Sequence, residues 1–291
     1  MPTIDFHQHL WPESLIELLS RRDRPPRLHG SSLGLAGEPE SEIDLRKHDP
    51  AARLALMDRF EIDVAVVSLQ PTLGLDALPE DEGAEIVAAY DVGIRELAKA
   101  ASERLVPLAA GPDLDGFAGM CVGAPELMDL DRIAPRLDEL VRRDALLFVH
   151  PGAATAPAGA PDWWAAVVAY TAQMQAAHAH WLAAGVARWP ALRVVFALLA
   201  GGAPFQLERL RSWGVSGRDV LHENVFFETS SYGNRALELC LATFGVSQLL
   251  FGTDVPVLDP EQGLDAVRGF GDAVADALCT QNPARLLGSK G

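Results

Sequence analysis

Short apolar runs alternate with segments of helical periodicity along most of this chain, and this alternation constrains the fold most. Apolar runs of this length predict buried strands, and the helices between them supply the crossovers that parallel strands need. The pattern predicts a (β/α)8 TIM barrel, with an open doubly wound sheet as the alternative. The predicted strands are the opening run up to His9 and residues 62–69, 105–110, 117–122, 146–149, 192–198, 225–229 and 248–252.

The segments between these strands differ in length and character. Residues 12–50 are rich in Arg, Pro, Gly and Ser and predict a long loop after the first strand, either a lid over the barrel or a mobile surface loop. A helical insertion of residues 162–188 is predicted after the fifth strand. Asp49 and Pro50 form an N-cap and first-turn pair for a helix. At 291 residues, we expect one domain spanning residues 1–291.

Polar residues end three of the predicted strands. His7 and His9 close the first, His150 the fifth, and Asp254 follows the eighth. Side chains at i and i+2 of a strand share a face, so both imidazoles of the first strand can reach one point. The carboxyl ends of barrel strands meet at one rim. Three histidines and an aspartate therefore predict a site for one divalent metal ion, zinc first, with manganese or iron as alternatives.

Composition excludes several other classes of function. The formal net charge of -16 argues against a nucleic-acid partner, which requires clustered Lys and Arg. Three scattered cysteines indicate neither a disulfide framework nor a cysteine-based zinc site. The opening residues do not resemble a signal peptide, and no apolar run reaches the ~20 residues that cross a bilayer. We expect a cytoplasmic protein with no membrane partner.

Four motifs together resemble a known family. FHQH after the first strand, FVHPG after the fifth, FGTDVP after the eighth and the terminal NPARLLG are similar to the amidohydrolase-related family of the amidohydrolase superfamily. The family includes the aminocarboxymuconate-semialdehyde decarboxylase group and other metal-dependent decarboxylases and hydrolases. The resemblance covers essentially the whole chain and implies that His7, His9, His150 and Asp254 are the metal ligands. It also implies a homodimer.

One position departs from the family pattern. Similar members carry a histidine after the sixth strand, before paired glycines, where it handles protons beside the metal. Here the stretch is FALLAGG, with Leu198 where the histidine is expected. Leucine exchanges no protons. Either another group substitutes, the chemistry needs only the metal and Asp254, or the chain has lost catalysis.

These residues support three functional hypotheses. The first is a hydrolase that acts on a small organic substrate, in which Asp254 is the catalytic residue and accepts the proton of a metal-activated water. The alternative is a non-oxidative decarboxylase of a small aromatic or unsaturated carboxylic acid. The second alternative is a catalytically silent barrel with a binding role, because of Leu198.

Five further residues are candidate substrate contacts. Arg46, near the end of the long loop, could pair with a substrate carboxylate, although a solvated surface arginine is the simpler interpretation. Trp11 and Trp163 could form an aromatic wall, or could pack under a loop. Glu228, near the end of the seventh strand, could face the barrel mouth, or could pair with a nearby basic residue.

His178 is the last of the five. His178 and His180 are the histidines nearest in sequence to the Leu198 position. They lie about 200° apart on a helix, so at most one can face a given site. Packing or surface positions on an outer helix are the alternative.

Overall fold

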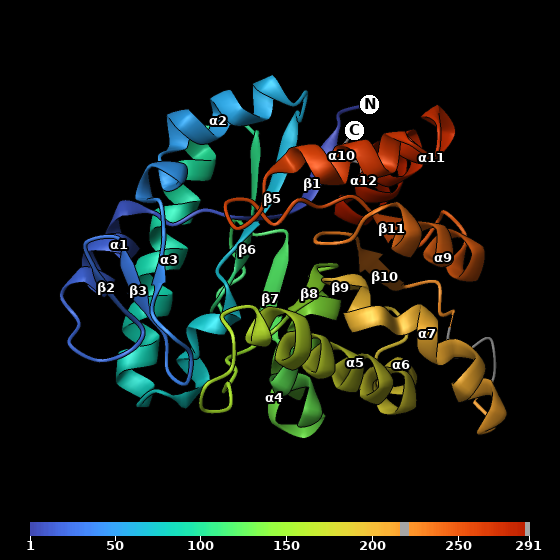
Figure 1. The fold of residues 1–291 in the computed structure, drawn as a ribbon, viewed down its shortest axis with the longest axis horizontal. Helices are drawn as coiled ribbons and strands as arrows, with labels where there is room; N and C mark the ends of the chain where they lie inside the picture. Colours follow the sequence, from blue (N-terminus) through green and yellow to red (C-terminus); the bar gives the residue numbers. More distant parts are fainter. Residues whose placement is uncertain (216–220, 289–291) are drawn as a thin grey trace.

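Eight parallel strands form the wall of a nearly closed barrel, surrounded by helices (Figure 1). The computed structural model describes residues 1–215 and 221–288. All eight predicted strands are present, so the prediction of a TIM barrel is confirmed. Around the barrel, the strands are β1 (Ile4–His9), β5 (Val64–Ser68), β6 (Leu105–Ala109), β7 (Gly119–Gly123), β8 (Leu146–His150), β9 (Val194–Phe196), β10 (Val225–Glu228) and β11 (Leu249–Leu250).

The barrel is closed by the segment that follows β11. The Phe6 N–H donates to the Phe251 carbonyl at 2.9 Å, and Gln8 bridges to Val255 in parallel. The Asp254 N–H donates to the His7 carbonyl at 2.8 Å. The eighth strand therefore lies beside the first, as the shared metal site requires.

Helices cover the outside of this wall. Asp49 caps α2 as predicted, because its side chain accepts from the Ala52 N–H. The helical segment after β11 is divided after Arg268, because Gly269 and Gly271 interrupt it. The helices described are α1 (Glu13–Ser20), α2 (Pro50–Arg59), α3 (Glu80–Ala100), α4 (Leu130–Arg142), α5 (Tyr170–His180), α6 (Val186–Arg188), α7 (Leu199–Ser212), α9 (Asn234–Phe244), α10 (Pro260–Arg268), α11 (Asp272–Asp276) and α12 (Asn282–Leu287).

The insertion after β8 is helical from Ala165 to Arg188, and wider π-helical turns flank α5. This agrees with the helical insertion of residues 162–188 that was predicted there, although its first residues form a turn. The segment 12–50 is more ordered than the expected loop. It contains α1 and a three-stranded antiparallel sheet of β2 (Arg27–His29), β3 (Ser32–Gly34) and β4 (Ser41–Glu42). Strands of two or three residues carry too short an alternation to be detected in sequence.

The barrel interior is apolar below the rim. Its large side chains are fully buried, and the Phe6 and Phe148 rings lie 6.5 Å apart. Truncating a phenylalanine packed in this way costs about 3–5 kcal/mol, so this layer gives the rim a rigid support. Three further fully buried phenylalanines, Phe196, Phe227 and Phe251, lie on the outer side of the strands, where they pack against the surrounding helices.

Two sequence expectations concern cysteines and membranes. Cys121, Cys240 and Cys279 are all buried free thiols. Within residues 1–215 and 221–288, none of the helices combines the length and the apolar character that a bilayer span demands.

Candidate metal centre

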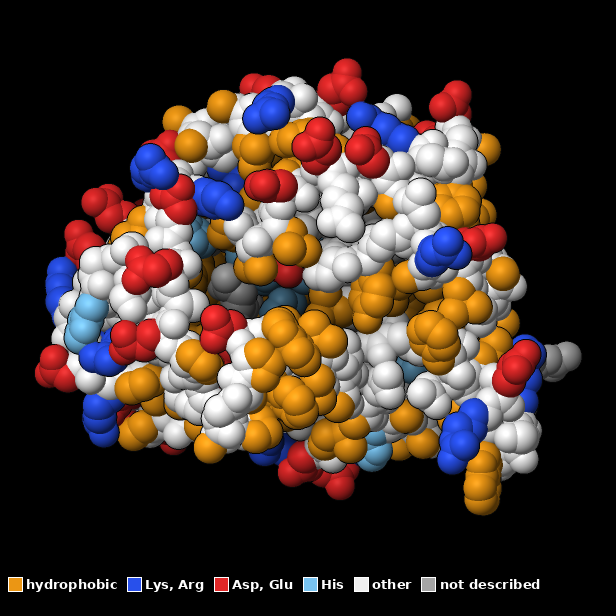
Figure 2. Space-filling view, in the orientation of Figure 1, with side chains coloured by type: hydrophobic (Ala, Val, Ile, Leu, Met, Phe, Trp, Pro, Cys, Tyr) orange, Lys and Arg blue, Asp and Glu red, His pale blue; other side chains and the backbone are white. Residues whose placement is uncertain are grey.

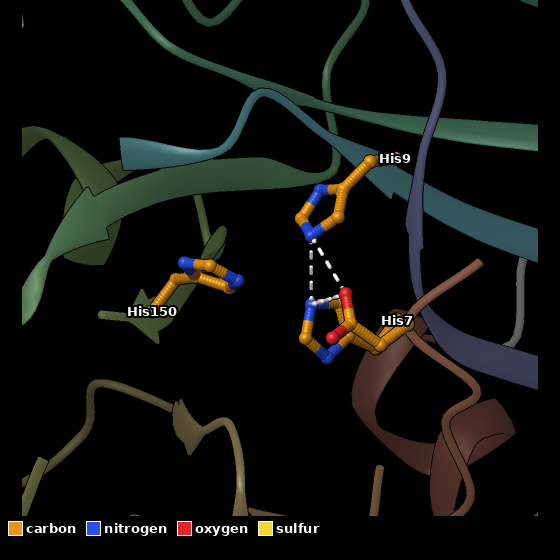
Figure 3. Close-up of side chains that lie close together, drawn as sticks. His7, His9 and His150 are labelled. Atoms are coloured by element: carbon orange, nitrogen blue, oxygen red, sulfur yellow. Dashed lines mark hydrogen bonds and ion pairs between the residues drawn. The ribbon is translucent and has the colours of Figure 1, made fainter. Parts of the chain in front are cut away.

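The three predicted histidines and the aspartate converge at the carboxyl end of the barrel. The ring centroids of His7 and His9 lie 4.9 Å apart, and His150 lies 5.1 Å and 5.0 Å from them. One ligand atom from each of these residues and from Asp254 lies within 4.8 Å of the other three. Figure 3 shows the three rings turned toward a common point. His7 and His9 therefore share one face of β1, as the i, i+2 spacing predicted.

Hydrogen bonds to the second ring nitrogen fix each histidine. His7 Nδ1 lies 2.8 Å from a carboxylate oxygen of Glu228, His9 Nδ1 lies 3.0 Å from the Ser68 carbonyl, and His150 Nδ1 lies 2.9 Å from the Pro151 carbonyl. Carboxylate and carbonyl oxygens only accept hydrogen bonds, so each Nδ1 carries a proton. In the neutral rings each Nε2 is then a free lone pair, which is the form that binds metals.

The distances between these lone pairs and one carboxylate oxygen of Asp254 indicate whether the site fits a cation. His7 Nε2 and His9 Nε2 lie only 3.1 Å apart, although neither carries a proton to share when the rings are neutral. Asp254 Oδ1 is buried without a hydrogen-bond partner among the described residues, and it lies 3.1 Å from His9 Nε2. Electron pairs at such distances repel one another unless a positive ion lies between them. The donor set fits a divalent metal.

Electrostatics lead to the same conclusion. Burial lowers the pKa of His7, but the negative charges of Glu228 and Asp254 outweigh burial and raise it to about 9. Burial, together with the neighbouring imidazoles, lowers the pKa of His9 and His150. Burial raises the pKa of Asp254, yet the surrounding histidines bring it below its usual value. The cluster thus requires one local positive charge, which a metal ion would supply in place of a proton.

Glu228 lies behind His7 rather than at the barrel mouth. It is fully buried, and both the Ser230 hydroxyl and the His7 ring donate to it at 2.8 Å. A Cβ at Gly252 would lie 2.1 Å from Glu228 Oε1, so only glycine permits this close approach. The hypothesis that Glu228 contacts substrate is therefore corrected. Its partner is a metal-site histidine, and not the basic residue of the alternative interpretation.

A buried network holds the closing segment in register. Asp5 accepts from the Thr253 hydroxyl at 2.6 Å and from the Gln8 amide at 2.7 Å. Burial raises the pKa of Asp5 to about 6, although these hydrogen bonds oppose the shift. Arg53 of α2 donates to Gln8 Oε1 and to the His9 carbonyl, each at 3.0 Å. This network places Asp254 beside the histidines of β1.

A cavity of about 820 Å³ opens above the cluster. Figure 2 looks into it: histidine lies at its floor, and hydrophobic side chains gather along its edge. The small sheet of β2, β3 and β4 supplies one wall, so the inserted segment does cover the rim. The residues that line the cavity include His9, Trp11, Leu33, Leu35, Glu38, Glu42, Ile43, Asp44, Lys47, His48, Gln70, His150, Val167, Tyr170, Leu198, Tyr232 and Asp254.

Leu198 lines this cavity at the position of the missing family histidine. Its φ is 53°, and the next four residues through Gly202 also have positive φ, so the chain makes one left-handed turn. Left-handed backbone at leucine and alanine costs about 1–2 kcal/mol per residue, and such strain concentrates at functional sites. The structure thus presents an apolar side chain where the family pattern has a proton carrier.

Of three other predicted substrate contacts, Trp11 lines the cavity, whereas Arg46 and Trp163 do not. Trp11 lines the cavity, with its indole N–H bonded to Gln70 Oε1 at 2.7 Å. Arg46 does not: it is 89% exposed and forms two 2.8 Å hydrogen bonds with Asp44. Trp163 is 56% exposed, stacks on Trp164 and does not line the cavity. The arginine pairs with the nearest carboxylate in its own turn, and the tryptophan lies before the helix that reaches the cavity.

His178 is also outside the metal cavity. It packs edge-on against Phe196 and Phe227, with ring centroids 5.2 Å and 5.3 Å away. The packing alternative therefore describes it correctly. Its helix turns it toward the barrel wall, whereas Tyr170, eight residues earlier on that helix, lines the cavity.

Several residues of the site were not predicted. Asp5 could have been identified from the sequence, because a carboxylate inside a buried strand requires hydrogen-bond partners. Glu38, His48 and Tyr170 carried no such signal, since they lie in segments whose position over the barrel depends on tertiary structure.

Residues 4–289 of the chain match the sequence model of the amidohydrolase family, so the chain belongs to this family. The predicted resemblance is confirmed, as is the expectation of an enzyme of this superfamily, hydrolase or decarboxylase.

One curated relative and two solved structures illustrate the similarity. The 2-amino-3-carboxymuconate-6-semialdehyde decarboxylase of Dictyostelium discoideum is 23% identical over 285 residues, covering 85% of this chain and 79% of the relative. The Metarhizium anisopliae IDCase has a TM-score of 0.80 at 20% identity, with 98% of this chain and 97% of that chain covered. The 5-carboxyvanillate decarboxylase of Novosphingobium aromaticivorans, complexed with manganese and 4-hydroxy-3-methoxy-5-nitrobenzoic acid, has a TM-score of 0.76 at 16% identity. This comparison covers 98% of this chain and 96% of the 5-carboxyvanillate decarboxylase chain.

Proposed function

We propose that this member of the amidohydrolase family is a metal-dependent, non-oxidative decarboxylase of a small aromatic or unsaturated carboxylic acid. The observation that carries the proposal is the cluster of three histidines and an aspartate on the floor of a largely apolar cavity. The relatives named above include two decarboxylases, which favours this reaction over the hydrolysis that the sequence suggested first.

His7, His9, His150 and Asp254 would hold the ion. When bound, a divalent metal polarises a substrate oxygen and stabilises the negative charge that develops as CO₂ leaves. The donor set suits zinc, and the manganese of the relative's complex supports manganese equally.

The chain's own residues have three tasks in this reaction. Trp11, whose indole stacks on His48 with ring centroids 4.8 Å apart, forms part of the cavity wall, and the apolar walls exclude water that would otherwise compete for the developing charge. Glu228 and the Ser68 and Pro151 carbonyls hold the imidazoles in their metal-binding orientation. Asp254 keeps one carboxylate beside the reacting group.

Charge in the cavity narrows the substrate class. Lys47 is the one lysine or arginine that lines the cavity within the described part of the chain, and its Nζ donates to the Pro256 carbonyl at 3.3 Å. Four carboxylates, at Glu38, Glu42, Asp44 and Asp254, line the same space. A second carboxylate on the substrate would face this negative lining, so we propose a monocarboxylic acid.

The test is a substrate screen on protein loaded separately with Zn²⁺ and with Mn²⁺. The panel contains hydroxylated benzoic acids such as 2,6-dihydroxybenzoate, dicarboxylic analogues such as 5-carboxyvanillate, and lactones and amides. We expect CO₂ release from a monocarboxylic aryl acid, and loss of that release in Asp254→Asn. Hydrolysis of a lactone or amide, with no CO₂ from any acid, would establish the hydrolase instead.

A further inference from the structure

Leu198 follows β9 and lies beside the metal cluster. On one side, β9 pairs with β8, the strand that ends in His150. On the other side, the Leu198 N–H donates to Glu228 Oε2 at 3.4 Å, and the same oxygen lies 2.8 Å from His7 Nδ1. The Leu198 side chain therefore enters the cavity next to the metal ligands.

The backbone of the turn after β9 uses its polar groups internally. The Leu198 carbonyl accepts the Gly201 N–H at 2.8 Å. The Ala197 carbonyl accepts the Ala200 N–H at 2.9 Å. The Gly201 carbonyl accepts a hydrogen bond from the Gln175 amide of α5. At this point of the cavity wall a ligand therefore meets the apolar side chain of Leu198 rather than a free backbone group.

The turn is also fixed in position. A Cβ at Gly201 would lie 2.1 Å from the Thr171 carbonyl oxygen, so the turn and α5 are in backbone contact. Residues 198–202 all have positive φ, and strained backbone of this kind persists only where its surroundings hold it. The Leu198 side chain is 8% exposed. A side chain held in this way discriminates between substrates, because a substituent that does not suit it cannot displace it.

The hydroxyl groups on the adjoining helix already act as donors elsewhere. Thr171 Oγ1 donates to the Val167 carbonyl at 2.7 Å, and Tyr170 Oη donates to Glu38 Oε1 at 2.9 Å. A polar substituent placed against Leu198 would lose hydrogen bonds to water that the leucine cannot replace. An apolar substituent loses none and buries its surface against the leucine.

We propose that Leu198 determines the specificity of the proposed decarboxylase, and this inference rests on the proposed function. Because Leu198 is next to the metal ligands, the substituent beside the leaving carboxylate is the one that meets it. The preferred acid carries hydrogen or an alkyl group on the flank of the carboxylate that faces β9. A hydroxyl on the opposite flank remains compatible with the site. The substrate class is an aryl acid with one flanking hydroxyl, and acids with hydroxyls on both flanks are poor substrates.

The test compares 2-hydroxy-6-methylbenzoate with 2,6-dihydroxybenzoate, since methyl and hydroxyl groups differ in polarity more than in size. The value of kcat/KM for CO₂ release is measured for each acid on metal-loaded wild type and Leu198→Asn. Asparagine is close to leucine in size and tolerates positive φ, so the turn is retained. The ratio of the two kcat/KM values is compared between the proteins, because the intrinsic reactivities of the acids then cancel. We expect Leu198→Asn to shift the ratio about 10- to 100-fold toward the dihydroxy acid.

A binding measurement accompanies the kinetics. The product phenols, 3-methylphenol and resorcinol, are titrated into the same metal-loaded proteins, and NMR gives their dissociation constants without turnover. We expect wild type to prefer 3-methylphenol and Leu198→Asn to shift the preference toward resorcinol.

Two further variants control for the substitution. Leu198→Met keeps an apolar side chain of similar volume, and Tyr232→Phe removes another hydroxyl that lines the cavity. Both should keep the wild-type ratio. An unchanged ratio in Leu198→Asn, or an equal shift in either control, would overturn the inference while leaving the decarboxylase standing. If neither acid releases CO₂, the phenol affinities decide the role of Leu198, and the substrate screen decides whether the protein is a decarboxylase.

Discussion

His178 provides a quantitative test of the barrel packing. Its ring is buried between α5 and the barrel wall, and its Nε2 is buried with no hydrogen-bond partner among the described residues. Burial in this apolar contact lowers the pKa of His178 from 6.5 to about 4. A proton there would place a charge against the faces of Phe196 and Phe227 with no partner to accept it.

The sign and size of the effect follow from linkage. Between pH 6.5 and 4 the unfolded chain binds the proton and the folded chain does not, so stability is lost as pH falls through this window. With these two pKa values, His178 costs the folded state about 2 kcal/mol of stability between pH 7 and pH 5.

The assay is urea unfolding of wild type and His178→Leu at both pH values. Leucine keeps most of the volume and removes the titrating nitrogen, while every other titrating group is shared and cancels in the difference. We expect the variant to lose about 2 kcal/mol less than wild type on acidification. An identical loss in the two proteins would refute the packing of His178 against the barrel wall.

Four further predictions address single contacts. Asp254→Asn should abolish turnover while the circular dichroism spectrum stays that of wild type; full activity would reject both the decarboxylase and the hydrolase hypotheses. Glu228→Gln should weaken metal binding by about 10–100-fold in a chelator competition, and unchanged affinity would remove its role behind His7. Asp49→Ala should cost about 1 kcal/mol in urea unfolding, because the Ala52 N–H loses its cap. Arg46→Ala should leave KM unchanged, whereas a tenfold rise would show that the arginine leaves Asp44 to bind substrate.

The sequence predicted the barrel well because two independent signals agree. Apolar runs with intervening helices indicate parallel strands, and polar residues at three strand tips indicate which strands must be neighbours. Asp254 beside His7 then requires closure of the sheet, as the structure has it. The small sheet over the rim was missed because its strands are too short for their alternation to be read.

The metal cluster was predictable and its surroundings were not. His7 and His9 are linked by strand periodicity, and His150 and Asp254 by their positions at strand ends. Substrate contacts depend on side-chain direction in loops and outer helices, which periodicity does not fix. In the structure Arg46 therefore pairs with Asp44, and Glu228 accepts a hydrogen bond from the His7 ring. Tyr170 lay in a helix already recognised, but only the folded structure places its side chain in the lining of the cavity.

The most direct test of the central claim is metal stoichiometry. Metal-free protein is dialysed against Zn²⁺ or Mn²⁺, washed, and analysed for bound metal beside His150→Ala and Asp254→Asn. Wild type should retain one divalent ion per chain, and each variant should retain much less at the same free metal concentration. A wild type that binds no metal, or a His150→Ala variant that keeps a full equivalent, would contradict a site built from these four residues.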